Sequence, residues 1–317
     1  MRFLVTGGAG FIGSHIATEL VRRGHDVRVL DDLSTGNMDN LSHLPSGSFE
    51  MIEGTICDFD TCLDAVGAKG RCPVDRVLHQ AAIPSVPRSI KAPLATFAAN
   101  VSGTQNILEA CVRGGVGQLV MASSSSVYGG AVPAEEDLPL APQSPYAAHK
   151  AACEQLCAAY GVFGLNAACL RYFNVFGPRQ DPDSPYSAVI PAFIRAARAG
   201  RPVTIHGDGL QTRDFTYVED VVAANLFMAE RPDISGTFNV GGGRRRCLLD
   251  LVRELEACLG IKVGMTYINP RDGDVRDSRA VMDKMHKLGY RTSVGFSLGL
   301  YKTVEWFDGQ TEAQTQA

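Results

Sequence analysis

Residues 1–13, MRFLVTGGAGFIG, decide the fold of this chain. Residues 2–6 form a short apolar run, as expected of a strand that is buried on both faces. Gly7, Gly10 and Gly13 follow at a spacing of three, and a helical pattern comes after them. Gly7 and Gly10 let the backbone turn and approach a pyrophosphate, whereas Gly13 lets the helix pack closely on the strand. The N-terminus of that helix would face the negative charge.

An acidic residue ends the next predicted strand. Residues 27–30 are mostly apolar, and Asp31 follows at the distance from the glycines expected of a residue that binds the adenosine ribose. A carboxylate there accepts hydrogen bonds from the ribose hydroxyls and repels a 2′-phosphate, which favours NAD over NADP. Strand, glycine turn, helix, strand and acid together predict a dinucleotide-binding unit.

The alternation of strands and helices continues along the chain. Further strands are predicted at 49–53, 74–79, 118–122 and 166–171. The helices between them are predicted at about 58–68, 93–113 and 145–162. Such alternation is typical of a doubly wound parallel sheet, in which ligands bind at the carboxyl ends of the strands. We therefore expect an α/β Rossmann domain over residues 1–175.

The pattern loosens beyond residue 177. Helices are predicted at 188–199, 218–230, 247–259 and 298–308, and short strands at 203–206 and 237–240. We expect a smaller α/β substrate-binding region over 176–308, with some later segments returning to the first domain. Residues 309–317 have no apolar residue except alanine, so we expect a disordered tail.

The composition limits the classes of function. The 317 residues are 45% hydrophobic with a net charge of −4, which is typical of a globular protein and favours neither nucleic-acid nor membrane binding. The nine cysteines are dispersed without a Cys-x-x-Cys pair, which indicates free thiols and no metal site. The N-terminus lacks the cleavage pattern of a secretory signal, so we expect a cytoplasmic protein.

A second group of residues lies on the helix predicted at 145–162. Tyr146 and Lys150 are four apart and share one helix face. An ammonium beside a phenol favours the phenolate, which takes a proton from an alcohol and returns it. Tyr-x-x-x-Lys alone is a loose pattern, and an ordinary surface pair would explain it. The dinucleotide-binding unit and the hydroxyl-rich run 123–126, at the end of a predicted strand, favour a catalytic pair.

These motifs, in their order along the chain, resemble one family. They are residues 6–13 (TGGAGFIG), 79–82 (HQAA), Ser124 before 127–129 (VYG), Tyr146 with Lys150, 171–178 (RYFNVFGP) and 213–215 (RDF). The chain resembles an extended short-chain dehydrogenase/reductase of the nucleotide-sugar epimerase type, similar to UDP-glucose and UDP-N-acetylglucosamine 4-epimerases. The resemblance extends from residue 1 to about residue 308.

The resemblance implies an NAD-dependent isomerase that acts on a UDP-hexose. Tyr146 would deprotonate the sugar C4 hydroxyl while hydride passes to NAD, and Lys150 would hold the nicotinamide ribose. Ser124 would hydrogen-bond the C4 oxygen. The 4-keto sugar would then rotate in the site and take the hydride back on its other face, so that no cofactor is consumed.

The resemblance also assigns binding residues. Cofactor contacts are implied for Gly7, Gly10, Phe11, Ile12, Gly13, Asp31, Asp32, Ala81, Ala82, Asn100, Tyr146, Lys150 and Tyr172. Substrate contacts are implied for Ser124, Ser125, Tyr146, Asn174, Val189, Arg213, Arg271, Asp274 and Ser278. Arg213 and Arg271 would pair with the diphosphate, and Asp274 would accept from the uridine ribose. Simpler alternatives are that Asn174 caps a turn and that Arg213 pairs with Asp214.

Departures from the family's patterns bear on the substrate. Residues 124–126 lack the carboxylate pair of sugar 4,6-dehydratases, so elimination is not expected. Ser278 is small where UDP-glucose-type enzymes often have a bulky residue, and 85–89 resembles the N-acetyl-tolerant branch. We therefore expect UDP-GlcNAc and UDP-GalNAc as substrates, with UDP-Glc and UDP-Gal as further candidates. Thr55 replaces an Asp that binds the adenine amino group in many relatives, which predicts weaker retention of NAD.

Alternatives remain open at this point. A UDP-glucuronate or UDP-pentose 4-epimerase would share the same motifs, and a non-catalytic NAD sensor would share the same fold. A homodimer is expected, because in the family the helices equivalent to 93–113 and 145–162 pack against their two-fold mates. Both stretches are rich in alanine here.

Overall fold

The computed structural model describes residues 1–181, 188–270 and 275–316, with the backbone alone from residue 311. The chain forms two compact units, which are described separately. The first comprises Met1–Gly129, Pro139–Tyr172 and Val221–Asn239. The second comprises Gly130–Leu138, Phe173–Asp220 and Val240–Ala317. The sequence did not indicate that Gly130–Leu138 would join the second unit, since no strand or helix marks this segment.

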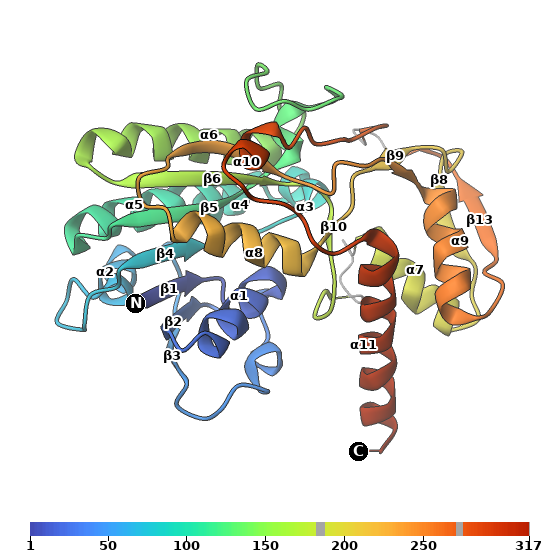
Figure 1. Cartoon of the computed structure of the whole chain (residues 1–317), viewed down its shortest axis with the longest axis horizontal. Coiled ribbons are helices and arrows are strands. Elements are labelled where there is room, and N and C mark those ends of the chain that lie inside the picture. Colours follow the sequence, from blue (N-terminus) through green and yellow to red (C-terminus); the bar gives the residue numbers. More distant parts are fainter. Residues whose placement is uncertain (182–187, 271–274, 317) are drawn as a thin grey trace. The chain divides into compact units, whose positions relative to one another are not determined.

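A seven-stranded sheet forms the centre of the first unit (Figure 1), in the order β11-β6-β5-β4-β1-β2-β3. The strands are β1 (Arg2–Thr6), β2 (Asp26–Asp31), β3 (Phe49–Glu53), β4 (Arg76–His79), β5 (Gln118–Ser124), β6 (Asn166–Tyr172) and β11 (Gly236–Val240). Every pairing from β3 through to β6 is parallel. The strand order reverses between β1 and β4, and ligands of doubly wound sheets bind at such a point. The Rossmann prediction is confirmed.

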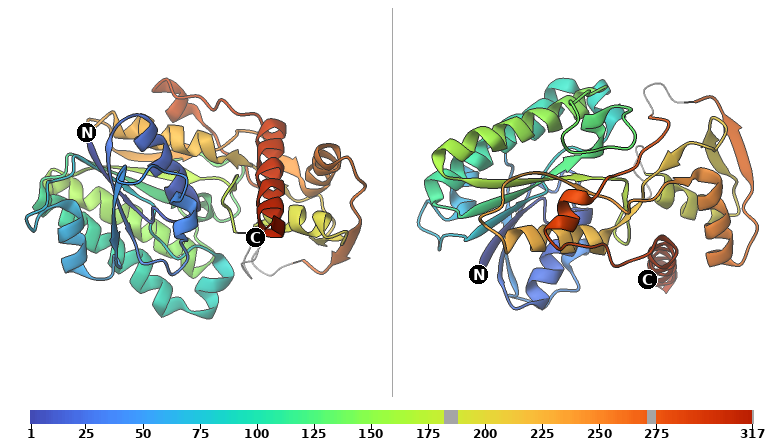
Figure 2. Two further views of the ribbon diagram at one scale, coloured as in Figure 1. Left: turned by 90° about the horizontal axis from the view of Figure 1, so that it is seen from below. Right: turned by 45° about the horizontal axis from the view of Figure 1, so that its top comes forward.

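Helices cover both faces of this sheet (Figures 1 and 2). The helices α1 (Phe11–Arg22) and α8 (Val218–Ala229) lie on one face. The other face carries α2 (Phe59–Val66), α5 (Gly103–Gly114) and α6 (Pro145–Tyr160). Shorter helices in this unit are α3 (Val86–Lys91), α4 (Pro93–Phe97), η1 (Met38–Leu41), η3 (Ser125–Tyr128) and η4 (Gly161–Phe163). Between α4 and α5 the chain makes a π-helical turn, Ala98–Ser102, which interrupts the helix predicted over 93–113.

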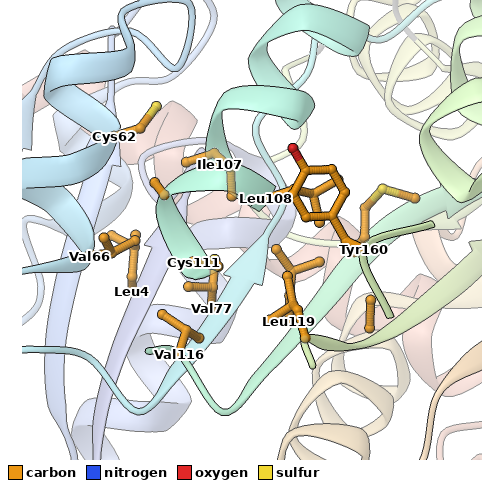
Figure 3. Close-up of a cluster of buried hydrophobic side chains, with 14 of the residues drawn as sticks. Leu4, Cys62, Val66, Val77, Ile107, Leu108, Cys111, Val116, Leu119 and Tyr160 are labelled. Atoms are coloured by element: carbon orange, nitrogen blue, oxygen red, sulfur yellow. The ribbon is translucent and has the colours of Figure 1, made fainter. Parts of the chain in front are cut away.

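The core under α2 and α5 holds these layers together (Figure 3). Leu4, Val77 and Leu119 project from the strands against Ile107 and other side chains of α5. Each of these four side chains is fully buried, and burying one such side chain contributes about 1.5–3 kcal/mol. Burial also raises the pKa of the Cys62 thiol, in the same cluster, to about 12. This cysteine is therefore a packing residue and not a nucleophile.

In the part of the chain that the structure describes, the strands of the second unit form short pairs. They are β7 (Val175–Phe176) with β10 (Thr216–Tyr217), β8 (Val203–His206) with β13 (Met265–Ile268), and β9 (Thr212–Arg213) with β12 (Arg246–Cys247). Its helices are α7 (Val189–Arg198), α9 (Leu248–Leu259), α10 (Asp283–Lys287) and α11 (Phe296–Gln316). Phe176, Phe215 and Phe296 pack together, with ring centroids 5.4–6.2 Å apart. This aromatic cluster joins strands β7 and β10 to the start of α11.

The disorder expected for residues 309–317 stays a prediction, while the described backbone is helical over most of this stretch. Helix α11 continues to Gln316. Apart from Gly309 this stretch contains no strong helix breaker, and a helix that has already formed extends at little cost. The lack of apolar residues does not by itself end a helix. None of the helices described here is both long enough and apolar enough to span a membrane.

Candidate active site

The carboxyl ends of the central strands bring the predicted residues of the first unit to one sheet edge. Thr6, the last residue of β1, is in register with His79, the last residue of β4. Ser124, at the end of β5, is in register with Tyr172, at the end of β6. Segments that are distant in sequence therefore end side by side: the glycine turn, Ala81 and Ala82 after β4, and Ser125 after β5.

The glycine turn leaves no room for side chains at Gly7 and Gly13. Gly7 has a φ of 68°, and a Cβ there would lie 2.7 Å from the backbone nitrogen of Ala81. A Cβ on Gly13 would lie 2.0 Å from the carbonyl oxygen of Gly7. Helix α1 begins at Phe11 and continues through Ile12. Its N-cap is Gly10, which has no side chain that could bind the first N–H groups of the helix. A helix N-terminus of this kind suits a pyrophosphate, so the turn fits a dinucleotide.

Asp31 faces this turn from the end of β2. Its Oδ2 accepts from the backbone N–H of Ala9 at 2.9 Å, and its Oδ1 accepts from Leu33 at 2.9 Å. Burial raises the pKa of this carboxyl, while its hydrogen bonds oppose the rise. A carboxylate has about four lone-pair sites, so it retains acceptors for ribose hydroxyls. Asp32 is exposed, and its Oδ1 accepts from the N–H and the hydroxyl of Ser34. Its predicted cofactor contact stays a prediction.

Helix α6 carries Tyr146 and Lys150. The Ser144 hydroxyl caps this helix and accepts from the N–H of Ala147 at 3.2 Å. Lys150 is buried, and its Nζ donates to the carbonyl oxygen of Ala122, on β5, at 2.7 Å. The ammonium is therefore held on the strand that ends in Ser124. Tyr146 is half-buried, and within the described part of the chain its hydroxyl has no hydrogen-bond partner.

Ser124 lies where β5 gives way to the short helix η3. Its Oγ accepts from the N–H of Ser126 at 3.2 Å and from the Ser126 hydroxyl at 2.9 Å. Both bonds use the oxygen as an acceptor, so the hydroxyl proton of Ser124 is left for donation. Ser125 is the first residue of η3. A hydroxyl donor and a phenol are thus available at this edge of the sheet.

His79, at the end of β4, is buried and hydrogen-bonds to residues of β1 and α5. Its Nδ1 lies 2.6 Å from the Thr6 hydroxyl, and its Nε2 lies 3.0 Å from the Thr104 hydroxyl. Since that hydroxyl donates to the carbonyl oxygen of Asn100, it accepts from His79, and the network assigns the ring proton to Nε2. Burial, followed by the charge of Lys150, lowers the pKa of His79 to about 3. A neutral, fully bonded imidazole is a scaffold and not a general base.

Asn100 and Tyr172, both predicted to contact the cofactor, make protein contacts here. Asn100, in the π-helical turn, accepts from the N–H of Ile83 at 2.7 Å and donates to its carbonyl oxygen at 3.0 Å. The Tyr172 hydroxyl donates to Gln80 at 3.1 Å and accepts from Asn225 at 2.7 Å. Burial raises the pKa of Tyr172, which disfavours its ionisation. Both residues fix the segment after β4 that contains Ala81 and Ala82, a role that their motifs did not indicate.

A buried ion pair lies one turn beyond Lys150, and the sequence did not indicate it. Glu154 on α6 accepts from Arg171 on β6 through two bonds of 2.9 and 2.7 Å. The Ser123 hydroxyl donates to the same carboxylate at 2.5 Å, and Arg171 also donates to the Tyr128 hydroxyl at 2.8 Å. The pair therefore joins α6, which carries Lys150, to β6 and to β5, which ends in Ser124.

Four of the predicted substrate residues, Asn174, Val189, Arg213 and Ser278, lie in the second unit. Asn174, with a φ of 32°, donates to the Ser278 hydroxyl at 3.1 Å, so the structure brings these two together. Arg213 donates to the carbonyl oxygens of Thr212 and Arg276. The carboxylate of Asp214, the alternative partner of Arg213, accepts from backbone N–H groups, and burial raises its pKa to about 6. Val189 is the first residue of α7. Arg271 and Asp274 lie outside the described residues.

Comparison with known proteins gives a family match. Residues 3–241 match the model of the NAD dependent epimerase/dehydratase family. A UDP-glucose 4-epimerase of Mycolicibacterium smegmatis is 38% identical to this chain, over 98% of this chain and 100% of that protein.

Solved structures are similar over nearly the whole chain. The UDP-N-acetylglucosamine 4-epimerase from Methanobrevibacter ruminantium, in complex with UDP-N-acetylmuramic acid, has a TM-score of 0.92 at 37% identity and covers 98% of both chains. The UDP-glucose 4-epimerase of Thermus thermophilus, in complex with NAD, has a TM-score of 0.89 at 38% identity and covers 98% of this chain and 99% of that one.

Proposed function

The chain belongs to the NAD dependent epimerase/dehydratase family, and from this premise we propose that it is a 4-epimerase of UDP-hexoses. It is an NAD-dependent isomerase, and the proposed reaction interconverts UDP-GlcNAc and UDP-GalNAc, with UDP-Glc and UDP-Gal as further substrates. The observation that carries the proposal is on α6: among the described residues the Tyr146 phenol has no hydrogen-bond partner, and Lys150 is anchored to the strand that ends in Ser124.

The protein residues supply binding and proton transfer. NAD, when bound, supplies the hydride acceptor and donor, held by the glycine turn, Asp31 and Lys150. Tyr146 as phenolate takes the proton of the C4 hydroxyl and gives it back. Ser124 donates a hydrogen bond to the C4 oxygen with the proton that its own contacts leave free. The Lys150 ammonium stabilises the phenolate by its charge.

Two features support the choice among related reactions. Residues 124–126 offer hydroxyls and no carboxylate, so proton transfer at C4 is supported and elimination of a hydroxyl is not. Ser278 is small, and its hydroxyl is already engaged by Asn174 and by the N–H of Asp214. A small residue at this position leaves more room for a 2-N-acetyl group than a bulky one would. This supports N-acetylated substrates.

Proton NMR of the purified protein with UDP-GlcNAc, and separately with UDP-Glc, tests the proposal. Growth of the anomeric signal of the C4 epimer in both samples, without added cofactor, is the expected result. Tyr146→Phe should lose several orders of magnitude in rate while keeping its bound NAD. Conversion of UDP-Glc alone would refute the role given to Ser278. No conversion of either sugar, even with added NAD, would overturn the proposal in favour of a UDP-glucuronate or UDP-pentose epimerase, or of a sensor if these also fail.

We further propose a cytoplasmic homodimer. All nine cysteines are free, as expected of a reducing compartment. Large apolar side chains are exposed on and beside α4 and after α6: Leu94 at 85%, Val162 at 82%, Phe163 at 66% and Phe97 at 47%. Such exposure is typical of a surface covered by a partner. Sedimentation of the wild-type protein at a dimer mass, and of Leu94→Glu at a monomer mass, is expected. A monomeric wild-type protein would contradict this.

A further inference from the structure

The backbone of Tyr146 is held by a residue from another helix. Tyr146 lies in the first turn of α6, where backbone N–H groups have no partner within the helix. Its N–H donates to the Ser89 hydroxyl on α3 at 3.0 Å. Ser89 is fully buried, and its own proton goes to the carbonyl oxygen of Val86 at 2.7 Å. The hydroxyl is thus oriented with its oxygen toward the tyrosine.

Helix α3 is itself fixed by a strained residue. Ser85 has a φ of 98° and a ψ of 118°, a conformation that residues other than glycine rarely adopt. Its hydroxyl caps α3 by accepting from the N–H of Arg88 at 3.3 Å. Two residues earlier, both backbone polar groups of Ile83 are bound by Asn100. Strain of this kind persists only where the surrounding structure imposes it, and it is concentrated at functional sites.

The segment from Ile83 to Ser89 therefore connects the neighbourhood of the glycine turn to helix α6. One end adjoins Ala81 and Ala82, which follow β4 and lie beside the glycine turn. The other end bonds to the main chain of Tyr146. Loss of this bond would leave a part-buried N–H without a partner, and the first turn of α6 would shift or fray. A shift of about 1 Å in a catalytic group costs on the order of 100-fold in rate.

We propose that Ser89 is a positioning residue for Tyr146. Its hydroxyl fixes the first turn of α6, so that the phenol stays in place relative to Lys150 and Ser124. The inference rests on the 4-epimerase function proposed above and goes beyond it, since Ser89 touches neither substrate nor cofactor in this role.

Ser89→Ala tests the proposal, because it removes the hydroxyl and adds no bulk. The expected result is a fall in kcat of about 10- to 100-fold with little change in KM. The amount of NAD bound should stay the same.

Thr96→Val is the matched control. Thr96, on α4, is also almost fully buried, and its hydroxyl donates to the carbonyl oxygens of Ala92 and Pro93 in its own helical segment. This substitution removes a buried helical hydroxyl that has no bond to α6, so kcat should be unchanged. Equal losses of kcat in the two variants would overturn the proposal.

Amide hydrogen exchange provides a readout that needs no substrate. The N–H of Tyr146 should exchange at least about tenfold faster in Ser89→Ala, and at the wild-type rate in Thr96→Val. If the wild-type protein converts no UDP-sugar but exchange responds in this way, the proposed function fails and the positioning contact stands. If exchange of Tyr146 is unchanged in Ser89→Ala, the positioning role is refuted whatever the activity.

Discussion

Arg171→Leu is expected to destabilise the protein strongly, because it leaves the Glu154 carboxylate buried without its counter-charge. The side chains of Arg171 and Glu154 are 4% and 2% exposed, and two hydrogen bonds join them. Of the described residues that bind the carboxylate, the Ser123 hydroxyl alone would remain after the substitution. Breaking one side of a buried pair costs about 3–5 kcal/mol in free energy of unfolding.

The double substitution Glu154→Leu with Arg171→Leu should cost less than the single one. It removes both charges. The Ser123 hydroxyl then loses its acceptor, and the Tyr128 hydroxyl loses the donor Arg171 but still donates to Asn239. Uncharged groups that lose a buried partner cost about 1–3 kcal/mol each, and apolar packing offsets part of this loss. The double variant should therefore be more stable than Arg171→Leu.

Urea unfolding, with NAD held at one concentration, measures these differences. Arg253→Leu is the control: its pair with Asp250 is exposed, so it should change stability by at most about 1 kcal/mol. Equal stability of the single and double variants would refute the reasoning.

Three further predictions concern the cofactor site and Asp214. Gly13→Ala places a Cβ 2.0 Å from the Gly7 carbonyl oxygen, so titration with NAD should show binding weakened by at least about tenfold; unchanged affinity would contradict the close packing. Thr55→Asp preserves an acceptor for the N–H of Cys57 and adds a charge, so the variant should retain NAD roughly tenfold better on dialysis. Equal loss of NAD from the variant and from the wild-type protein would contradict a role for this position. Burial raises the pKa of Asp214 from 3.8 to about 6, so its contribution to stability is fully present below about pH 4 and is lost as the pH rises to about 6. Asp214→Asn should flatten the fall in unfolding free energy over this range, and an unchanged pH slope would show that other groups cause it.

The fold of the first unit could be predicted because its signals are local. Apolar runs such as 2–6, followed by a glycine turn, indicate a buried strand without knowledge of its neighbours. The strained Ser85 and the π-helical turn Ala98–Ser102 could not be predicted in this way. They depend on contacts between distant segments, such as that of Asn100 with Ile83, and local residue preferences do not encode such contacts.

The candidate site was predictable at the level of residue type but not of partner. Spacing alone placed Tyr146 and Lys150 on one helix face, and α6 confirms that helix. The anchor of Lys150 on the Ala122 carbonyl, and that of Tyr146 on Ser89, connect elements that are far apart in sequence. The partner of a polar side chain becomes known only when the sheet brings these elements together.

The two tyrosines at this sheet edge show why partners decide function. Tyr172 and Tyr146 both belong to motifs, yet the Tyr172 hydroxyl is committed to Gln80 and Asn225, whereas in the described chain the Tyr146 hydroxyl bonds to no protein group. A preorganised site needs neighbours whose polar groups are satisfied, because an unpaired group in a low-dielectric region would reorient. Tyr172 thus supports neighbouring segments through these bonds, and Tyr146 is the residue that we propose as the acid and base. A sequence motif contains both supporting residues and residues with a proposed catalytic role, and their hydrogen-bond partners distinguish the two.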